Sequence, residues 1–149
     1  MSTPRDATTA DLPRLVELGR AMHAESPRFS KLRFSAPKLA EQLCGLIISP
    51  DGFLQVVERD GAIVGGLAGA ISEHWCSPDK VAFDMALFIN PDRRGGMAAA
   101  KLVDAFKTWA AENGAVHITL GISTGVMVEE TARLYRAIGL KQFGYLFEV

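Results

Sequence analysis

The sequence predicts one α/β domain in which helices cover both faces of a mixed, mostly antiparallel sheet of about six to seven strands. Short apolar runs with the spacing of buried strands alternate with longer stretches of helical spacing. An Asp-Gly pair at residues 60–61 lies between two apolar runs, which is a strong hairpin signal. A strand, a helix and a further strand follow one another over residues 83–120, and this order indicates a right-handed parallel crossover.

Length and composition describe an ordinary globular chain. The 149 residues suffice for one domain, residues 1–149, that buries roughly two-thirds of its unfolded surface. The formal net charge is -1, and no basic stripe with interleaved aromatic residues runs along the chain, so we expect neither nucleic acid nor membrane as a partner. The N-terminus lacks the apolar core of a signal peptide, and no apolar run reaches the length of a membrane span. These features predict a cytoplasmic protein.

The two cysteines, Cys44 and Cys76, are far apart in the sequence. They show neither a C-x-x-C spacing nor a Cys/His spacing typical of zinc sites. Reduced thiols therefore agree with the sequence better than a disulfide, and we expect no metal site.

The first third of the chain predicts an edge strand and two helices. Residues 1–6 are suited to a short strand, and Thr8 with Asp11 approximates a capping box at the start of a helix that ends near Glu25. A polar connection over residues 23–34 precedes a second helix, which Ser35 and Pro37 open.

The middle of the chain predicts three strands and a phosphate-binding turn. Residues 53–58 and 62–72 form the arms of the hairpin, and residues 83–89 form the next strand. Arg93, Arg94, Gly95 and Gly96 then precede a helix that Gly114 ends. The unpaired N–H groups of that helix, the bare glycine backbone and the two cations together favour a bound phosphate.

The last third predicts a strand over residues 116–120 and a helix over residues 126–138, which Gly139 ends. A final apolar stretch over residues 143–149 has the composition of a strand that closes the sheet.

Two motifs in this chain resemble those of the GNAT superfamily of acyl-CoA-dependent N-acyltransferases. The run Ile89-x-Pro91-x-x-Arg94-Gly95 with the helix after it is similar to the family's R/Q-x-x-G-x-G/A signature. Leu134-Tyr135-x-x-x-Gly139-Leu140 is similar to the family's late L-Y-x-x-x-G-F segment, and the order of elements also agrees.

The resemblance leaves two registers open for the signature. Counted from Arg93, its small positions fall on Gly96 and Ala98; counted from Arg94, they fall on Met97 and Ala99. The second register agrees with the position of Pro91 but places methionine where the family has glycine. Val128 likewise stands seven positions before the tyrosine, where the family often has asparagine.

The resemblance implies transfer of an acetyl group from acetyl-CoA to a primary amine within a ternary complex. It also implies that the strand before the turn and the turn itself hold acetyl-CoA, the backbone of the strand facing the thioester and the turn facing the pyrophosphate. The implied cofactor-binding residues are Leu87, Phe88, Ile89, Arg93, Arg94, Gly95, Gly96, Met97, Ala98 and Ala99.

Two side chains are candidates for proton transfer. The resemblance implies that the Tyr135 phenol protonates the departing CoA sulfur, although a tyrosine on an apolar helical stripe is equally suited to the core. Asp84 lies in an apolar strand, where burial raises the pKa of a carboxyl, and is either a general base or a paired structural carboxylate. Glu25, Glu73, His74 and His117 are weaker candidates for a base, and a water chain is a further alternative.

The resemblance places the acceptor beside the connection between the first two helices. We expect Glu25, Phe29, Arg33 and Phe34 to form one wall of its pocket, and a solvated connector is the competing interpretation. The acceptor is a small molecule or a peptide, and a homodimer is compatible with the sequence. Two other functions stay open: a non-catalytic acyl-CoA-binding or sensing module, and an α/β domain that binds another phosphate ligand.

Overall fold

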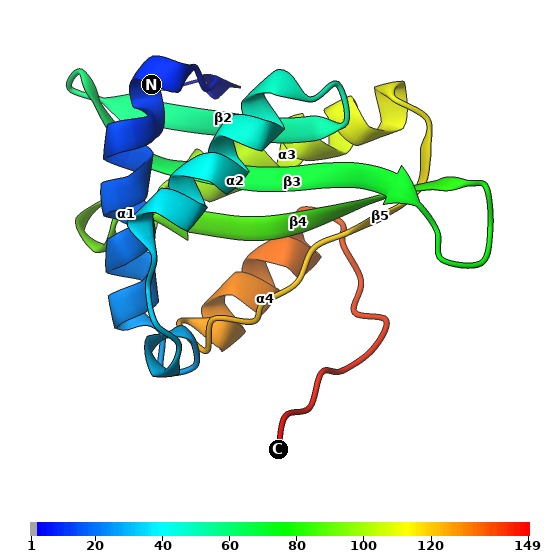
Figure 1. Ribbon diagram of the computed structural model, residues 1–149. Coiled ribbons are helices and arrows are strands. Elements are labelled where there is room, and N and C mark those ends of the chain that lie inside the picture. Colours follow the sequence, from blue (N-terminus) through cyan, green and yellow to red (C-terminus); the bar gives the residue numbers. More distant parts are fainter. Residues whose placement is uncertain (1–2) are drawn as a thin grey trace.

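The computed structural model describes residues 3–149, in which a five-stranded sheet lies between two layers of helices (Figure 1). The strands lie side by side in chain order, and each pair is antiparallel except the last, β4 and β5, which is parallel. Their bounds are Arg5–Asp6 (β1), Gly52–Arg59 (β2), Ala62–Glu73 (β3), Lys80–Ile89 (β4) and Ala115–Thr119 (β5).

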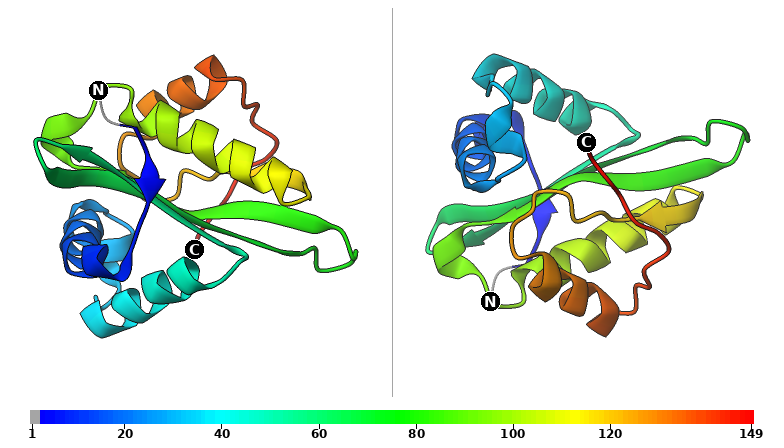
Figure 2. Two further views of the ribbon diagram at one scale, coloured as in Figure 1. Left: turned by 90° about the horizontal axis from the view of Figure 1, so that it is seen from above. Right: turned by 90° about the horizontal axis from the view of Figure 1, so that it is seen from below.

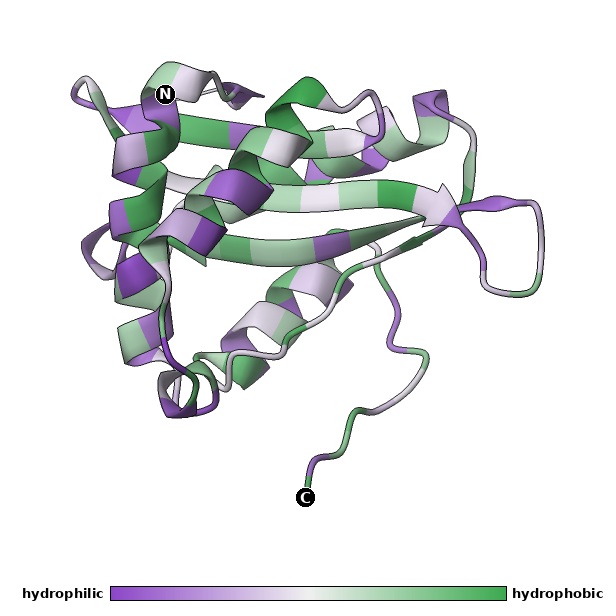
Figure 3. Cartoon of the chain, in the orientation of Figure 1, coloured by the Kyte–Doolittle hydropathy of each residue, from purple (hydrophilic) through white to green (hydrophobic). Residues whose placement is uncertain are grey.

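Four α-helices cover the two faces of the sheet, α1 and α2 on one face and α3 and α4 on the other (Figure 2). Their apolar sides point toward the sheet and their polar sides toward solvent, as the spacing of apolar residues predicts (Figure 3). Their bounds are Leu12–Glu25 (α1), Ala36–Ile48 (α2), Ala98–Glu112 (α3) and Val128–Ala137 (α4). Within residues 3–149, each helix is too short or too polar to cross a lipid bilayer.

Local backbone signals place the turns where the sequence predicts them. Asp60 and Gly61 have φ angles of 53° and 78°, so both occupy the left-handed region that a two-residue hairpin loop requires between β2 and β3. The Thr8 N–H donates to the Asp11 carboxylate at 2.8 Å, and the helical segment begins there with a short 3-10 turn.

The core between the sheet and α3 is tightly packed around Phe106, which is fully buried. A methyl group added at Gly69 on β3 would lie 2.6 Å from Cε1 of Phe106 and 2.9 Å from the carbonyl oxygen of Phe83. The absence of a side chain at Gly69 therefore lets the ring of Phe106 lie directly against the strand.

We expect Gly69→Ala to lower the free energy of unfolding by about 1 to 3 kcal/mol, because the added methyl overpacks the core against backbone as well as a ring. Gly45→Ala is the matched control, since nothing lies within 4 Å of a methyl group at this position in α2. That change should be neutral or stabilising by up to roughly 1 kcal/mol. Urea unfolding measures both, and equal effects at the two glycines would contradict the close contact at Gly69.

The two parallel strands separate after a short paired segment. Pairing between β4 and β5 extends only from Lys80 with Ala115 to Phe83 with Thr119. In β4, Met85 has no partner on β3, since Asp84 pairs with Gly69 and Ala86 with Ala68. This bulge bends β4 where β5 leaves it, so the carboxyl-terminal half of β4 has no strand beside it on that side.

The prediction for the end of the chain is wrong. Residues 143–149 do not form a strand, so the sheet has five strands instead of the six to seven expected. These residues are exposed and have no regular secondary structure, and among residues 3–149 no backbone hydrogen bond joins residues 141–149 to a strand. The composition of a strand is insufficient without hydrogen bonds to a neighbouring strand. At the other end, β1 is confirmed at Arg5–Asp6, and residues 1–2 of the expected strand lie outside the described residues.

Candidate functional site

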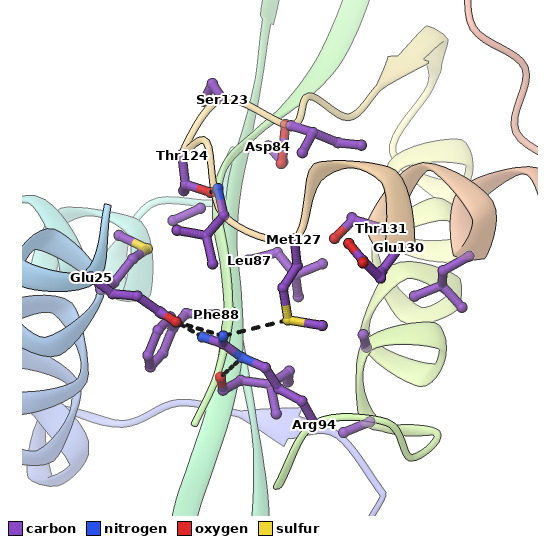
Figure 4. A pocket seen from close by; sticks show the side chains of 18 of the residues that line it. Glu25, Asp84, Leu87, Phe88, Arg94, Ser123, Thr124, Met127, Glu130 and Thr131 are labelled. Carbon is purple, nitrogen blue, oxygen red and sulfur yellow. Dashed lines mark hydrogen bonds and ion pairs between the residues drawn. The ribbon is translucent and has the colours of Figure 1, made fainter. Parts of the chain in front are cut away.

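A cavity of about 320 Å³ opens where β4 and β5 separate (Figure 4). Its floor is the carboxyl-terminal half of β4, its sides are the end of α1 and the start of α4, and its two ends are the turn before α3 and the loop after β5. Ligands of α/β proteins bind beyond the carboxyl ends of parallel strands, and this cavity has that position.

The turn between β4 and α3 presents backbone to the cavity. Gly95 has a φ angle of +93°, a conformation that L residues rarely adopt, and a methyl group at Gly95 or Gly96 would meet nothing within 4 Å. The turn is therefore open on its outer side. Ala98 begins α3, and the first N–H groups of that helix have no partner within the helix. This end of the cavity is suited to an anionic group.

Arg94 spans the mouth of the cavity and binds the end of α1. Its two terminal nitrogens donate to the two carboxylate oxygens of Glu25 at 2.8 and 2.7 Å, and its Nε donates to the Ile89 carbonyl oxygen at 2.7 Å (Figure 4). The guanidinium also lies 5.3 Å from the centre of the Phe88 ring. This hydrogen-bonded partner holds the pKa of Glu25 below its ordinary value. The pair connects the predicted acceptor side of the cavity to the predicted cofactor turn.

Asp84 and Tyr135 lie on the wall of the cavity next to the bulge in β4. The Asp84 carboxylate accepts a hydrogen bond of 2.9 Å from the Gly121 N–H, yet burial is the larger effect and raises the pKa of Asp84. Burial likewise raises the pKa of Tyr135, and the negative charge of Asp84 raises it further. Tyr135 is therefore a neutral phenol across the physiological range of pH, and its helix α4 places it at the cavity.

We expect Asp84→Asn to raise the melting temperature at neutral pH and to leave it unchanged at about pH 3. The pKa of Asp84 is higher in the folded chain than in the unfolded chain, where it is about 3.9. Below that pH Asp84 is protonated in both states and costs no stability, and the free energy of unfolding falls as the pH rises through the pKa of the folded state. Asparagine keeps an acceptor for Gly121 and stays neutral, so the variant lacks this fall. Thermal unfolding across that range of pH is the measurement, and parallel curves for the two proteins would contradict a raised pKa.

The structure brings together most of the predicted cofactor residues and half of the predicted acceptor residues. Glu25 and Phe29 line the cavity. Arg33 is exposed outside it, and Phe34 packs against His23 and under the guanidinium of Arg20 instead. The connection turns after Phe29, so its second half faces away from the cavity. Of the ten predicted cofactor residues, Met97 alone does not line the main cavity; it lines a smaller one on the outer side of the turn.

Sequence reasoning missed the loop after β5 and the first turn of α4. Both line the cavity, and Met127 at the start of α4 has the left-handed φ angle of 48°. The loop was predictable in principle, because it follows the carboxyl end of a parallel strand. The missed lining residues are Met22, Met85, Ala86, Gly121, Ile122, Ser123, Thr124, Val126, Met127, Glu130, Thr131 and Leu134.

Three of the four weaker base candidates and both cysteines lie outside the cavity. Glu73, His74 and His117 do not line the cavity, and the exposed Cys76 contacts His74 in the loop between β3 and β4. In the part of the chain that the structure describes, no group of three or more His, Cys, Asp or Glu side chains is arranged to hold a metal ion.

Comparison with known proteins yields a family and a fold. The model of the acetyltransferase (GNAT) family matches residues 19–140, which include the second half of α1, the whole of α2, the cavity and the whole of α4. Among curated proteins, no sequence matches the chain significantly.

Several solved structures have the same fold at low sequence identity. The aminoglycoside N-acetyltransferase AAC(6')-Iy in complex with CoA is 14% identical, with a TM-score of 0.80 over 100% of this chain and 93% of that one. A transcriptional regulator from Bacillus halodurans C-125 is 21% identical, with a TM-score of 0.79 over 100% and 99% of the two chains. An aminoglycoside acetyltransferase from an uncultured soil metagenomic sample, in complex with sisomicin, is 21% identical, with a TM-score of 0.71 over 99% and 95%.

Proposed function

The chain belongs to the GNAT acetyltransferase family, and from this premise we propose that it transfers the acetyl group of acetyl-CoA to a primary amine by direct attack in a ternary complex. The observation that carries the proposal is the cavity itself, because it joins a turn suited to an anion to a half-buried Asp84 and a buried Tyr135 across the unpaired half of β4. A purely structural crossover needs neither an opening between its strands nor ionisable groups inside it.

The turn before α3 is suited to the pyrophosphate of acetyl-CoA. The N–H groups at the start of α3 and the bare backbone of Gly95 and Gly96 face an anion at this end, and Arg94 lies beside them. The pantetheine arm then lies along β4 from Ile89 toward Leu87, where the missing neighbour strand leaves backbone groups free for it. Acetyl-CoA supplies the activated acyl group as a substrate, and the proposal includes no metal.

The chemistry requires a neutral amine, a polarised carbonyl and a proton for the leaving sulfur. The amine nitrogen attacks the thioester carbon, and a backbone N–H of β4 stabilises the oxyanion as the C–N bond forms. When the C–S bond breaks, Tyr135 donates its phenolic proton to the sulfur. Asp84 accepts the proton that the amine loses, because its raised pKa makes it a stronger base than an exposed aspartate.

The acceptor end of the cavity favours an amine that is cationic in solution and that loses one proton to water before it attacks as the neutral amine. The acidic residues Glu25 and Glu130 line it, and Phe29 and Met22 offer apolar contact beside them. The aminoglycosides named for similar structures are amines of this kind, so they belong in the first set of acceptors to be tried. Arg33 and Phe34 are left out of the proposed pocket because they lie outside the cavity.

The test is acetyl-CoA consumption in the presence of chemically diverse primary amines, with the mass of each product recorded. We expect a product heavier by one acetyl group, formed with release of one CoA. Binding of acetyl-CoA without turnover for any amine would favour a sensing module. Binding of other nucleotides as tightly as CoA would favour a different phosphate-binding domain, since the turn alone does not select the pantetheine arm.

We expect Glu25→Gln to tighten acetyl-CoA binding by about twofold to fivefold, because Arg94 must leave Glu25 before it can reach the pyrophosphate. Their side chains are 18% and 30% exposed, and a partly exposed ion pair contributes about 0.5 to 1 kcal/mol. The same variant should raise the Michaelis constant of the amine. Calorimetry and steady-state kinetics measure the two effects, and Arg33→Ala is the control outside the cavity. Weaker acetyl-CoA binding in Glu25→Gln would mean that the pair holds Arg94 in place for CoA.

A further inference from the structure

Large apolar side chains line the main cavity from several elements. Three of them are methionines, Met22 from α1, Met85 from the bulge in β4 and Met127 from the start of α4 (Figure 4). Phe29 lines the cavity from the connection after α1. Met85 is 47% exposed and Met127 is 44% exposed, so both have apolar surface that a bound molecule would remove from water. The flexible thioether side chains adapt to the shape of an apolar ligand.

The negative charges of the cavity are largely satisfied by the protein itself. Three acidic and two basic residues line it, so its formal net charge is -1. Both carboxylate oxygens of Glu25 accept hydrogen bonds from Arg94. The half-buried Asp84 carboxylate accepts one from the Gly121 N–H. Glu130 lies in the first turn of α4, where the helix dipole stabilises a negative charge. The cavity therefore has no row of spare carboxylates for a ligand with several ammonium groups.

The uncharged polar side chains of the cavity are few and short. Besides the Tyr135 phenol, they are the hydroxyls of Ser123, Thr124 and Thr131. The Thr124 hydroxyl already accepts a hydrogen bond of 3.2 Å from the Val126 N–H. In the part of the chain that the structure describes, no Asn, Gln, His or Trp side chain lines this cavity. A ligand with many hydroxyl groups would bury several of them without partners, which disfavours its binding.

The apolar wall continues beyond the cavity along β4. Ala86, which lines the cavity, pairs with Ala68 of β3, and Phe83 pairs with Ala70. Ala68 and Ala70 are two positions apart and so point to the same face of the sheet, where Ala68 is buried in the core under α1 and α2. Their partners share that face. Phe83 is 37% exposed there, so a ligand longer than the cavity meets further apolar surface.

We infer that the acceptor is a monoamine, with a single primary amine on an apolar alkyl or aromatic body. The inference rests on the proposed acetyl transfer and narrows its acceptor from primary amines in general to this class. The amine lies toward Asp84 and the backbone of β4, where it attacks the thioester. The body lies against Met22, Phe29 and Met85, which exclude water from it without requiring a hydrogen bond.

Acetylation rates of matched amines are the first test. Hexylamine and 1,6-diaminohexane have the same length, and the second carries an ammonium group where the first carries a methyl group. We expect kcat/KM to be about 10-fold or more higher for hexylamine, because the second ammonium finds no counter-charge at the apolar end. From propylamine to hexylamine, kcat/KM should rise about fourfold for each added CH₂ group. Sisomicin, which has several amines and hydroxyls, should react more slowly than hexylamine.

Two substitutions on different elements place a carboxylate at the apolar end. Met85→Glu and Met22→Glu should each lower the preference for hexylamine over 1,6-diaminohexane by about 10-fold or more, because the new carboxylate pairs with the second ammonium. Ile48→Glu is the matched control, since Ile48 is 75% exposed at the end of α2 and lies outside the cavity. It should leave the preference unchanged, and circular dichroism with thermal unfolding shows that each variant is folded.

The methyl signals of methionine in nuclear magnetic resonance spectra report binding without turnover. Hexylamine, added in the presence of CoA, should shift the signals of Met22 and Met85. It should not shift that of Met97, which lines the smaller cavity. If no amine is acetylated but these shifts occur, the proposed reaction is wrong and the apolar amine site is supported.

Three results would overturn the inference while leaving the proposed reaction in place or testing it separately. The first is faster acetylation of 1,6-diaminohexane or sisomicin than of hexylamine. The second is a preference for hexylamine that Met85→Glu and Met22→Glu both leave unchanged. The third is the absence of any shift of the Met22 and Met85 signals with hexylamine, whether or not an amine is acetylated.

Discussion

Replacement of Tyr135 by phenylalanine is expected to lower the turnover number by about 100-fold to 10000-fold, with little change in the Michaelis constant of acetyl-CoA. The substitution removes one hydroxyl and keeps the ring that packs against the core. Turnover falls because the sulfur then leaves as an unprotonated thiolate in a buried site, where a negative charge is poorly solvated.

The raised pKa of Tyr135 is compatible with this role. Burial disfavours the phenolate, and the same low-polarity surroundings raise the basicity of the thiolate that takes the proton. The pKa values of the phenol and of the CoA thiol are therefore closer to each other in this site than the pKa of a thiol in water suggests, so the proton transfer is less unfavourable. The phenol also stays protonated through neutral pH, which is the form that an acid needs.

Pre-steady-state measurement of the chemical step is the decisive assay, since slow release of product would hide a change in chemistry. Thermal unfolding of Tyr135→Phe shows that the core is kept. Tyr145→Phe is a matched control, because Tyr145 lies on the exposed C-terminal segment outside the cavity. An unchanged rate of acyl transfer in Tyr135→Phe would assign Tyr135 to packing alone.

Removal of the Arg94 side chain is expected to weaken acetyl-CoA binding by about tenfold or more, because a charged hydrogen bond contributes about 1.5 to 3 kcal/mol. Arg93→Ala is the matched comparison within the same turn. Within residues 3–149, the one ion pair of Arg93 is a 3.4 Å contact with the exposed Asp60, and Arg93 lines the smaller cavity on the outer side of the turn as well as the main cavity. Its removal should weaken acetyl-CoA binding much less. That result would favour the register of the family signature that is counted from Arg94.

Calorimetric titration of the two variants with acetyl-CoA separates these expectations. Arg94→Ala also releases Glu25, so the double variant with Glu25→Gln isolates the contribution of the cation from that of the broken pair. Equal weakening in Arg93→Ala and Arg94→Ala would mean that the turn presents both arginines to the phosphate. If neither variant bound acetyl-CoA more weakly, the backbone N–H groups of the turn would be sufficient to bind the pyrophosphate without either arginine.

The sequence by itself determined the elements whose conformation depends on neighbouring residues. Asp60 and Gly61 adopt the left-handed backbone of a hairpin loop, and Gly95 adopts a positive φ before α3, because steric limits on each residue act locally. The spacing of apolar residues in α3 is likewise a local pattern, and it predicts which side of the helix packs against the sheet. The parallel crossover to β5 follows from the order of elements, and with it the cavity beyond the carboxyl ends of the strands.

Only the tertiary structure decided which distant side chains meet and which segment finds a partner. Glu25 and Arg94 come from the end of α1 and the turn before α3, and no local pattern predicts that they form an ion pair. The charge of Asp84 raises the pKa of Tyr135 because the fold places β4, with its bulge at Met85, beside α4. The apolar run over residues 143–149 predicts a strand, yet strand formation requires hydrogen bonds to a second backbone. Within the described residues, 143–149 form no backbone hydrogen bond to a strand.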